Sequence, residues 1–591
     1  MLQCTMTVPP APGFDSVVLS AILRELAPFT GGRVTRITQP GKTEVALFLR
    51  TKGFTAKLLF SIDPETARLH LASRKDPAAP LSPFTQLLRR YLEGARLQRV
   101  EQPPFERIAT FHFEALQGPI QLVAELMGRH SNLILVSRGS VLGAMKVITA
   151  EVSRPRQIYP GGPYLPPPTS GTPAPQEIRE EELADRLRRS RKPLWKALPD
   201  VVRGIGPSLA RELIVRCNLD PNGPASSFRD VQDLLGQLRD LADLVARGAF
   251  SPRLYLDDEK TPVAFSPFPF TSLSHLHAVP LAMSEAVEAV YEAFLAHHQW
   301  TEEHNSLRST IEAHLGRLSQ VAAGLERTLE EAKESDRLRL FGELLLAYAS
   351  QVPPGAPEAV VPGYSAGEEV RIPLDPRLSA VENAQAYFKR YSKLRATRRA
   401  AEERLERVKA EAESLTSLLL HLEQATTLDD LAEIRRELEE EGYLKGAPAP
   451  QPTARKPRAY RTGDGFTILV GRSNQENDRL TFQIARPGDL WFHARGVPGA
   501  HVILQTAGRI PSPEAIEAAA QVAAYFSKAR GSGRVQVDYT ERRHVRRPSQ
   551  GRPGMVLYER ERSLWVTPAL PPQLAPRSQP RPPRRTPPSA P

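Results

Sequence analysis

The sequence predicts a multidomain α+β protein with an N-terminal α/β domain, a helical region, a long antiparallel coiled-coil hairpin and a C-terminal α/β domain. Three observations predict this architecture. The chain has 591 residues, which is too long for one hydrophobic core. Two stretches rich in Pro and Gly, residues 159–177 and 446–458, divide it. Between them, two long segments carry apolar residues at heptad spacing.

The N-terminal α/β domain is predicted to comprise residues 1–165. Apolar residues at helical spacing predict a helix over residues 14–26. Residues 84–102 predict an amphipathic helix that ends at Gly94 and passes into a strand. Stretches of β-type composition, with turn signals between them, predict strands at residues 33–40, 44–50, 57–63, 68–73, 107–113 and 120–126.

Residues 166–180 predict a linker, and residues 181–280 predict a helical region with an extension. Within that region, residues 201–217 read as a hydrophobic helix, a Gly-Ile-Gly turn and a second helix, which resembles a helix-hairpin-helix. In that motif, glycines such as Gly204 and Gly206 let backbone N–H groups approach a phosphate at a helix N-terminus. A plain packing turn is the alternative interpretation.

Residues 281–445 predict the coiled-coil hairpin with an insertion. The two heptad segments are about 50 residues apart, whereas helical connections in bundles are short, so we expect them to pair within one chain. A dimeric coiled coil is the alternative. Four heptads reach roughly 40 Å, the length of a spacer or probe. The heptad residues are Ile311, Leu315, Leu318, Ala322, Leu325, Leu329 and Ala332 in the first segment, and Tyr391, Leu394, Ala401, Leu405, Val408, Ala412, Leu415, Leu419 and Leu422 in the second.

After a second linker at residues 446–458, residues 459–568 predict the C-terminal α/β domain. One helix is predicted over residues 513–530. Residues 569–591 hold nine prolines and four arginines, which predicts a disordered basic tail. The predicted strands are residues 466–472, 480–485, 490–495, 501–506, 535–540, 555–560 and 563–568.

Positive charge is concentrated at the C-terminal end. Residues 455–591 hold 23 Lys and Arg against 10 Asp and Glu, a net charge of +13. The whole chain has a net charge of +11, so the remainder has a net charge of −2. A basic module beside a nearly neutral body favours a polyanionic partner, most directly nucleic acid. A solvated surface that serves solubility is the alternative.

Two segments of this basic module have the side chains that RNA-binding surfaces use. On the strand at residues 490–495, half the side chains face a core, and the others could stack on unpaired bases. Guanidinium groups clustered in residues 539–554 suit phosphate, although an ordinary solvated loop is the alternative. The candidate RNA-binding residues are Trp491, His493, Arg495, His501, Arg542, Arg543, Arg546 and Arg547, with Arg552 in the same loop.

The sequence contains no signature of catalysis. It has no nucleophile elbow, no phosphate loop, no HExxH and no paired Cys-x2-Cys motif, so we predict no catalytic residues, no cofactor and no metal. The histidines are scattered, and each is interpreted as a packed or hydrogen-bonding side chain, although three could still converge in space. The histidines concerned are His112, His130, His493, His501 and His544.

Two cysteines, Cys4 and Cys217, are too few for a disulfide framework or a structural zinc site. The apolar runs are too short to span a membrane, and the first residues lack the pattern of a secretion signal. We therefore expect a cytoplasmic protein without membrane contact.

The first domain has two polar candidates for ligand binding. Residues 127–132, Met-Gly-Arg-His-Ser-Asn, interrupt a strand with more hydrogen-bonding groups than a turn requires. A turn with a capping Ser or Asn is the alternative. Glu106 and Arg107 lie at the entrance of another strand, where the two side chains could simply pair with each other.

Several segments together resemble the NFACT family. Residues 13–19, 31–40, 87–102, 106–113, 125–132 and 159–168 resemble its N-terminal domain, NFACT-N. Residues 383–395 resemble the start of its second coiled-coil arm. Residues 477–504 and 537–568 resemble its C-terminal RNA-binding domain, NFACT-R. The resemblance covers nearly the whole chain in the family's domain order.

The resemblance implies a ribosome quality-control factor that positions tRNA and has no catalytic residues. Such a factor binds a large ribosomal subunit, through rRNA, that is obstructed by a peptidyl-tRNA. It recruits charged tRNA, alanyl-tRNA in bacteria, and supports template-free addition of a C-terminal Ala tail that marks the stalled chain for degradation. The ribosome forms the peptide bond. A small RNA-binding quality-control protein is a further implied partner.

The resemblance also assigns roles to individual residues. Glu106 stands where the family usually has Asp, and Ala500 stands where Ser is common. A surface fibronectin-binding adhesin and a coiled-coil RNA-binding scaffold without tailing activity are the alternative functions. By the family match, the tRNA-binding and tailing residues are Asp15, Glu106, Arg107, Glu125, Met127, Gly128, Arg129, His130, Ser131 and Asn132.

Overall fold

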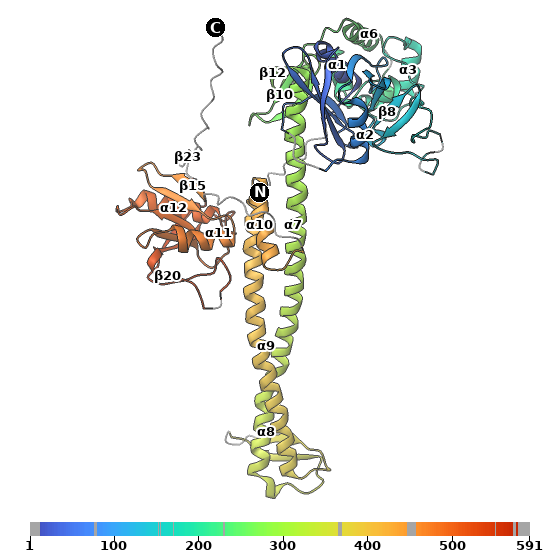
Figure 1. The fold of residues 1–591 in the computed structure, drawn as a ribbon. Helices are drawn as coiled ribbons and strands as arrows, with labels where there is room; N and C mark the ends of the chain where they lie inside the picture. Colours follow the sequence, from blue (N-terminus) through green and yellow to red (C-terminus); the bar gives the residue numbers. More distant parts are fainter. Residues whose placement is uncertain are drawn as a thin grey trace. The chain divides into compact units, whose positions relative to one another are not determined.

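The computed structural model describes residues 12–75, 80–151, 153, 155–168, 171–228, 231–364, 369–445, 457–549, 551–570 and 575–576. The described chain divides into two compact units at the step from His298 to Gln299. Figure 1 shows their elements, and each unit is described here by itself. Cys4, most of the second predicted linker and most of the predicted disordered tail lie outside the described residues.

A nine-stranded sheet forms the centre of the N-terminal unit (Figure 1). Its strands are β1 Arg33–Thr38, β2 Glu44–Arg50, β3 Thr55–Ser61, β4 Arg68–Leu71, β5 Arg96–Glu101, β6 Ile108–Ala115, β7 Gly118–Glu125, β8 Asn132–Ser137 and β9 Ser140–Ala144. The order is β4-β3-β2-β1-β5-β6-β7-β8-β9, and all the pairings between these strands are antiparallel. The strands predicted from the sequence in this unit are confirmed.

Two helices complete the core of this sheet. In α1 (Ser16–Glu25), Val18, Leu19 and Ile22 are buried, as the helical spacing predicts. In α2 (Pro83–Leu92), the side chain of Ser82 caps the first turn, and Leu88 is buried in the same core. The hydrophobic face of each helix therefore packs against the sheet, and the polar face remains outside.

The next segment contains four helices with a core of their own, namely α3 Glu180–Arg188, α4 Leu194–Val201, α5 Pro207–Arg216 and α6 Gln232–Arg247. The prediction of a helical region with an extension over residues 181–280 did not include the strands of its last part, residues 253–280. Three short strands, β10 Arg253–Leu256, β11 Pro262–Ser266 and β12 His277–Pro280, form an antiparallel sheet there. Its buried Tyr255 has the hydroxyl group 3.2 Å from Ser266 Oγ, a long-range contact that local sequence does not reveal.

The heptad segments are long helices. They are α7 Met283–Ala332 and α9 Ala380–Glu423, and α10 Leu428–Glu440 follows. One apolar cluster contains Leu307 and Ile311 of α7, Leu415 and Leu422 of α9, and Leu431 of α10. The segment between α7 and α9 has its own small core, built by α8 Ser335–Ala347 and the hairpin of β13 Glu358–Pro362 and β14 Glu369–Pro373.

A seven-stranded antiparallel sheet forms the C-terminal module (Figure 1). Its strands are β15 Arg458–Arg461, β16 Thr467–Val470, β17 Leu490–Ala494, β18 Val502–Gln505, β19 Val535–Glu541, β22 Arg562–Val566 and β23 Ala575–Pro576. The order is β22-β19-β17-β18-β16-β15-β23. Helix α12 Pro513–Tyr525 shares a core with one face. A second apolar cluster, which includes Trp491, lies on the other face.

The predicted strand at residues 480–485 was wrong. Ser473 caps α11 Asn474–Arg479, and the chain continues as one π-helical turn, Leu480–Ile484. Leu480 is buried in the second apolar cluster and Thr481 bonds His501 in the same region, so tertiary contacts outweigh β-type composition. The strand predicted at residues 555–560 is reduced to β21 Leu557–Tyr558, which pairs with β20 Val545–Arg546.

Candidate functional site

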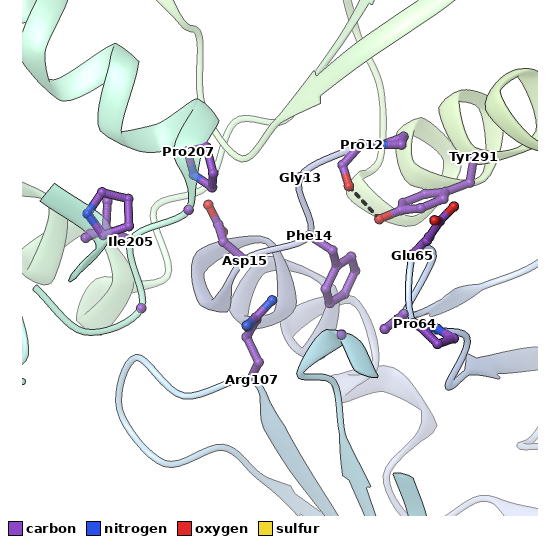
Figure 2. Close-up of a pocket in the computed structure, with 15 residues that line it drawn as sticks. Pro12, Gly13, Phe14, Asp15, Pro64, Glu65, Arg107, Ile205, Pro207 and Tyr291 are labelled. Atoms are coloured by element: carbon purple, nitrogen blue, oxygen red, sulfur yellow. Dashed lines mark hydrogen bonds between the residues drawn. The ribbon is translucent and has the colours of Figure 1, made fainter. Parts of the chain in front are cut away.

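A cavity of about 390 Å³ in the N-terminal unit brings together residues from distant parts of the sequence (Figure 2). Asp15 comes from the start of α1, Arg107 from the entrance of β6, and Gly128 from the loop after β7. Gly206 comes from the turn between α4 and α5, and Tyr291 comes from α7. The volume lies in the range of small-molecule sites, which is about 300–1,000 Å³.

Asp15 is buried at the N-terminus of α1. Its Oδ1 accepts hydrogen bonds from the backbone N–H groups of Val17 at 3.0 Å and Val18 at 2.9 Å. Burial raises the pKa of the carboxyl group to about 6, against these two bonds and the charge of Arg107, which act to lower it. Asp15 therefore both caps the helix and places a titratable group beside Arg107.

Asp15→Asn is expected to stabilise the N-terminal unit at alkaline pH. Because the folded pKa of about 6 lies above the ordinary 3.8, the carboxyl group contributes stability that is present below about pH 4 and lost as the pH rises through 6. A shift of this size corresponds to about 3 kcal/mol. Asn caps helices as well as Asp, so the variant should melt near the wild-type temperature at pH 4 and above it at pH 8.

Melting curves at the two pH values check this expectation. Asp258→Asn, which makes the same change at an exposed position of the same unit, is the control and should show no pH-dependent difference. A melting difference for Asp15→Asn that is equal at pH 4 and pH 8 would contradict the role of Asp15 ionisation.

Arg107 presents its guanidinium group to the cavity, beside Asp15. Its side chain is exposed and points toward Asp15 in Figure 2. Its guanidinium group makes no hydrogen bond or ion pair within 4 Å among the residues that the structure describes, while its backbone carbonyl accepts from the N–H of Leu126 at 2.8 Å. The backbone is thus fixed, and the N–H fork is open to an anionic ligand.

The carboxylate of Glu106 faces the helical segment. Its Oε1 lies 3.6 Å from Nε of Arg203, in the turn between α4 and α5. The two side chains are about one-fifth to one-quarter exposed, so the pair contacts both protein and solvent. The sequence-based alternative that Glu106 pairs with Arg107 is not observed among the described contacts.

The glycines of the Gly-Ile-Gly turn allow close packing. Gly204 has a φ of +81°, and Ser16 Oγ donates a hydrogen bond to its carbonyl at 2.8 Å. A Cβ at Gly206 would lie 2.9 Å from Cβ of Asp15. Because neither position carries a side chain, this turn can pack closely against the first turn of α1, and it completes the wall of the cavity.

The loop at residues 127–132 divides into an exposed part and a buried part. Gly128 lines the cavity, and Arg129 Nε donates to His130 Nε2 at 3.0 Å, with both side chains exposed. Ser131 and Asn132 are buried, and Asn132 binds the backbone N–H and carbonyl of Lys146. Met127 is half-buried. The structure thus leaves Arg129 and His130 available to a ligand and uses Asn132 to hold the loop.

Glu125 is buried, and both oxygens of its carboxylate accept hydrogen bonds. Its carboxylate accepts hydrogen bonds from Arg156 Nη1 at 2.9 Å and Nη2 at 2.5 Å, and from the hydroxyl of Tyr164 at 3.0 Å. Burial and the neighbouring Glu125 charge raise the pKa of Tyr164 above its ordinary value. In this arrangement Glu125 holds the segment after β9 against β7, at the base of the loop.

The C-terminal candidates Trp491 and His493 of β17 and Arg495, directly after it, lie on one face of the sheet, opposite α12. Trp491 is completely buried, with its ring stacked 5.7 Å from that of His493. His501 is buried and its Nδ1 lies 2.8 Å from Thr481 Oγ1. Burial lowers the pKa of both His493 and His501, so both rings are neutral at pH 7. Arg495 is half exposed on the same face as His493.

The arginine-rich loop has protein carboxylates as its counter-ions. Glu541 pairs with Arg543, and Glu559 lies 3.4 Å from Arg546. Asp478 binds Arg547 through two bonds, of 2.6 and 2.9 Å. Arg542 donates from Nε to the carbonyl of Thr481, and Arg552 donates to Glu441 and Tyr443. These guanidinium groups thus have protein partners in the described structure, and exposed pairs of this kind are weak enough to be exchanged for phosphate.

Among the described residues, no cluster of three or more His, Cys, Asp and Glu side chains has the geometry to hold a metal ion. In the same part of the chain, none of the helices combines the length and apolar character needed to cross a bilayer. Burial raises the pKa of the Cys217 thiol to about 11, which disfavours the nucleophilic thiolate.

Sequence reasoning missed four residues that the structure places in or beside these sites. Tyr291 belongs to a helix that the sequence indicated only as a spacer, yet its hydroxyl donates to the carbonyl of Pro12 at 2.8 Å in the cavity wall (Figure 2). Glu65 lies in a turn without a motif, and Arg203 precedes the Gly-Ile-Gly turn, where only the glycines were singled out. Trp565 is flanked by apolar residues on both sides, so its exposure could not be inferred from the pattern.

Comparisons with known proteins agree with this arrangement. A family model described as NFACT N-terminal and middle domains matches residues 15–456, and one described as NFACT protein RNA binding domain matches residues 456–559. The chain belongs to the NFACT family. The basic C-terminal module is thus its RNA-binding domain, and the cavity around Asp15 and Arg107 lies in the NFACT N-terminal region.

Several relatives match over most of their length. "Rqc2 homolog RqcH" of Bacillus subtilis (strain 168) is 31% identical over 94% of this chain and 98% of its own. "Rqc2 homolog RqcH" of Streptococcus suis is 33% identical over the same shares. A solved structure of the C-terminal part of a fibronectin/fibrinogen-binding protein from Streptococcus suis is 34% identical, covers 46% of this chain and 96% of its own, and has a TM-score of 0.38.

Proposed function

We propose that this protein is a ribosome quality-control factor. It binds large ribosomal subunits that are obstructed by peptidyl-tRNA, recruits charged tRNA, in the first instance alanyl-tRNA, and supports template-free Ala tailing of the stalled chain. The ribosome forms the peptide bond, and the protein positions RNA. A small RNA-binding protein completes the assembly, which forms in the cytoplasm.

The end-to-end family match carries this proposal. The two family models follow one another from residue 15 to residue 559, and relatives named Rqc2 homolog RqcH are matched over 98% of their length. A concentration of basic residues in the RNA-binding domain supports the same function, because phosphate neutralisation dominates the affinity of proteins for nucleic acids.

The cavity in the N-terminal unit is the proposed tRNA site. The open guanidinium group of Arg107 suits a phosphate or a carboxylate, and Asp15 beside it suits a hydroxyl or amino group. Arg129 and His130 are exposed on the loop whose Gly128 lines the cavity. Glu106 acts through its contact with Arg203, which ties the Gly-Ile-Gly turn to the entrance of β6.

The helices α7 and α9 are proposed to form an antiparallel coiled-coil hairpin within one chain. Support comes from the cluster that contains Leu307 and Ile311 of the first helix together with Leu415 and Leu422 of the second. The turn between α4 and α5 is proposed to act as a helix-hairpin-helix. The hairpin gives the protein its reach along a ribosomal subunit.

Purification of the tagged full-length protein from its own cells, with RNA sequencing and a sucrose-gradient profile, tests the proposal. Large-subunit rRNA together with enriched alanine tRNA is the expected result. Large-subunit rRNA without tRNA would overturn the tailing part of the proposal. Absence of both RNAs from the purified protein and from the large-subunit fractions would overturn the whole proposal.

Arg107→Ala is expected to weaken tRNA binding by roughly 10- to 100-fold, the value of one charge-assisted contact. The melting temperature should change little, because the side chain is exposed and interacts with Asp15 and Glu106 only through its charge. Arg50→Ala removes the same charge at an exposed position outside the cavity lining and serves as the matched control. Equal tRNA affinity of the two variants, measured at one salt concentration, would refute the role of Arg107.

A further inference from the structure

The face of the C-terminal sheet opposite α12 carries an exposed tryptophan. On β22, Leu564 and Val566 pack into the core that α12 shares with the sheet. Because side chains alternate along a strand, Trp565 belongs to the opposite face. Its side chain is 58% exposed, and β22 is an edge strand of the sheet.

The register places Trp565 beside polar residues of two neighbouring strands. Gln536 of β19 pairs with Trp565, and its backbone carbonyl accepts from the N–H of Arg495 at 2.9 Å. Arg495 Nη1 lies 3.4 Å from Ser563 Oγ, which confirms that the guanidinium group reaches across β19 on this face. Arg495, Gln536 and Trp565 therefore form one row across the sheet.

The adjacent row leads into a cavity of about 390 Å³. In that row, His493 pairs with Asp538, and Asp538 pairs with Ser563. His493 and Tyr558 line the cavity, and the hydroxyl of Tyr558 donates to Asp538 at 2.9 Å. The remaining wall includes Val497, Pro498, Met555 and Val556.

Apart from Glu413, whose exposed carboxylate lies at the edge of this cavity, the polar groups named here have protein partners. Asn477 Oδ1 accepts from the N–H of His501 at 3.0 Å, and Asp538 accepts from both Tyr558 and Ser563. His493 carries a lowered pKa and is neutral at pH 7. The walls thus offer ring faces and apolar side chains, which suit a flat, uncharged aromatic group and discriminate little between bases.

This face carries positive charge, and part of the Arg495 guanidinium group has no partner among the described residues. Arg495 is half exposed, and its described contacts are those of Nη1 with Ser563 and Asp538, so Nε and Nη2 have no partner among the described residues. Arg534, directly before β19, is also exposed, and its Nη2 donates to the backbone carbonyl of Trp565 at 3.3 Å. An aromatic platform, an aromatic cavity and a guanidinium group between them match the repeat of base and phosphate in a single strand.

We propose that this face binds single-stranded RNA, with one unpaired base in the cavity beside His493 and Tyr558 and another stacked on Trp565. The Arg495 guanidinium group contacts the phosphate between them. This inference rests on the proposed RNA-binding function and names the form of RNA that the C-terminal domain takes.

Fluorescence anisotropy of the full-length protein with a labelled oligouridine dodecamer tests the inference, with an RNA duplex of the same length as comparison. Trp565→Ala is expected to weaken binding of the single strand by roughly 5- to 150-fold, the value of one stacked base, and to leave duplex binding and melting temperature unchanged. Trp565→Phe should retain most of the affinity. Phe54→Ala removes a similarly exposed aromatic ring (60% exposed) in the other unit and is the control.

Photocrosslinking of a 5-bromouridine-substituted dodecamer provides a second readout, with crosslinks expected at Trp565 or Tyr558. Equal single-strand affinity of wild-type protein and Trp565→Ala would overturn the inference, as would equal losses for single strand and duplex. If the protein co-purifies with large-subunit rRNA but binds no dodecamer, the inference fails while the proposed function stands. Loss of a protein partner alone in Trp565→Ala would identify the face as a protein-binding surface instead.

Discussion

Gly204→Ala is expected to destabilise the N-terminal unit by about 3 kcal/mol or more, the sum of backbone strain and overpacking. An added Cβ would lie 2.4 Å from the carbonyl oxygen of Phe105 and 2.5 Å from Ser16 Oγ. The φ of +81° is also one that residues with a side chain rarely adopt. Relief of these clashes requires the turn between α4 and α5 to move away from α1.

This movement would also open the cavity. Ser16 Oγ donates to the carbonyl of Gly204, and the neighbouring Gly206 faces Asp15. A displaced turn separates Arg203 from Glu106 as well, since the distance between their charged groups is only 3.6 Å. We therefore expect Gly204→Ala to reduce both melting temperature and tRNA binding, whereas Arg107→Ala reduces binding alone.

Gly236→Ala is the matched control for this prediction. Gly236 lies inside α6 of the same unit, and an added Cβ would contact nothing within 4 Å. Ala is the better helix former by roughly 0.5–1 kcal/mol, so this variant should be slightly more stable than wild type. Thermal melting and hydrogen exchange of the peptides that cover α1 and α5 compare the two variants. Wild-type protection of both peptides in Gly204→Ala would show that the turn tolerates a side chain.

The alternation and the helical spacing of apolar residues were sufficient to predict most elements of the N-terminal fold. Strands β1 to β7 of its sheet were predicted because they combine a β-type run with a clear turn, as at β2 and β3, whereas β8 and β9 were not predicted. The pairing order and the contribution of Tyr291 from α7 could not be predicted, since they depend on contacts between residues that are far apart in sequence. The site residues Asp15 and Arg107 were named only through the family resemblance.

One error and one omission in the C-terminal half have the same physical cause. Residues 480–485 have strand composition but form a π-helical turn because Thr481 bonds buried His501 and Leu480 fills the second apolar cluster. Exposure of Trp565 was hidden because both faces of its sheet are partly covered, so the apolar pattern is not strictly alternating. In both cases, tertiary packing decides what local sequence leaves open.

Glu437→Gln is expected to stabilise the C-terminal unit strongly at alkaline pH. Glu437 of α10 is completely buried, and its Oε2 accepts a long hydrogen bond of 3.4 Å from the N–H of Gln475 in α11. Burial, together with the neighbouring charges of Glu441 and Glu433, raises the pKa of its carboxyl group from 4.5 to about 8. The neutral acid is thus the form that suits this contact between α10 and α11.

The direction of the pH effect follows from this shift. Because the folded pKa lies above the ordinary one, the carboxyl group contributes stability that is fully present below about pH 4.5 and lost as the pH rises through 8. The resulting loss in the free energy of unfolding is on the order of 5 kcal/mol at most. Gln has the same shape and cannot ionise, so Glu437→Gln should remove most of the decline in melting temperature between pH 6 and pH 9.

Glu406→Gln, at an exposed position of α9, changes the net charge equally and should leave the decline unchanged. Parallel melting curves for Glu437→Gln and wild type across this pH range would contradict an ionising Glu437. Ser473 caps α11, which leads directly into the π-helical turn, and Leu480 of that turn shares an apolar cluster with Trp491. A weakened contact at Glu437 should therefore be transmitted to the RNA-binding sheet. RNA affinity of the wild-type protein should therefore fall more steeply above pH 8 than that of Glu437→Gln.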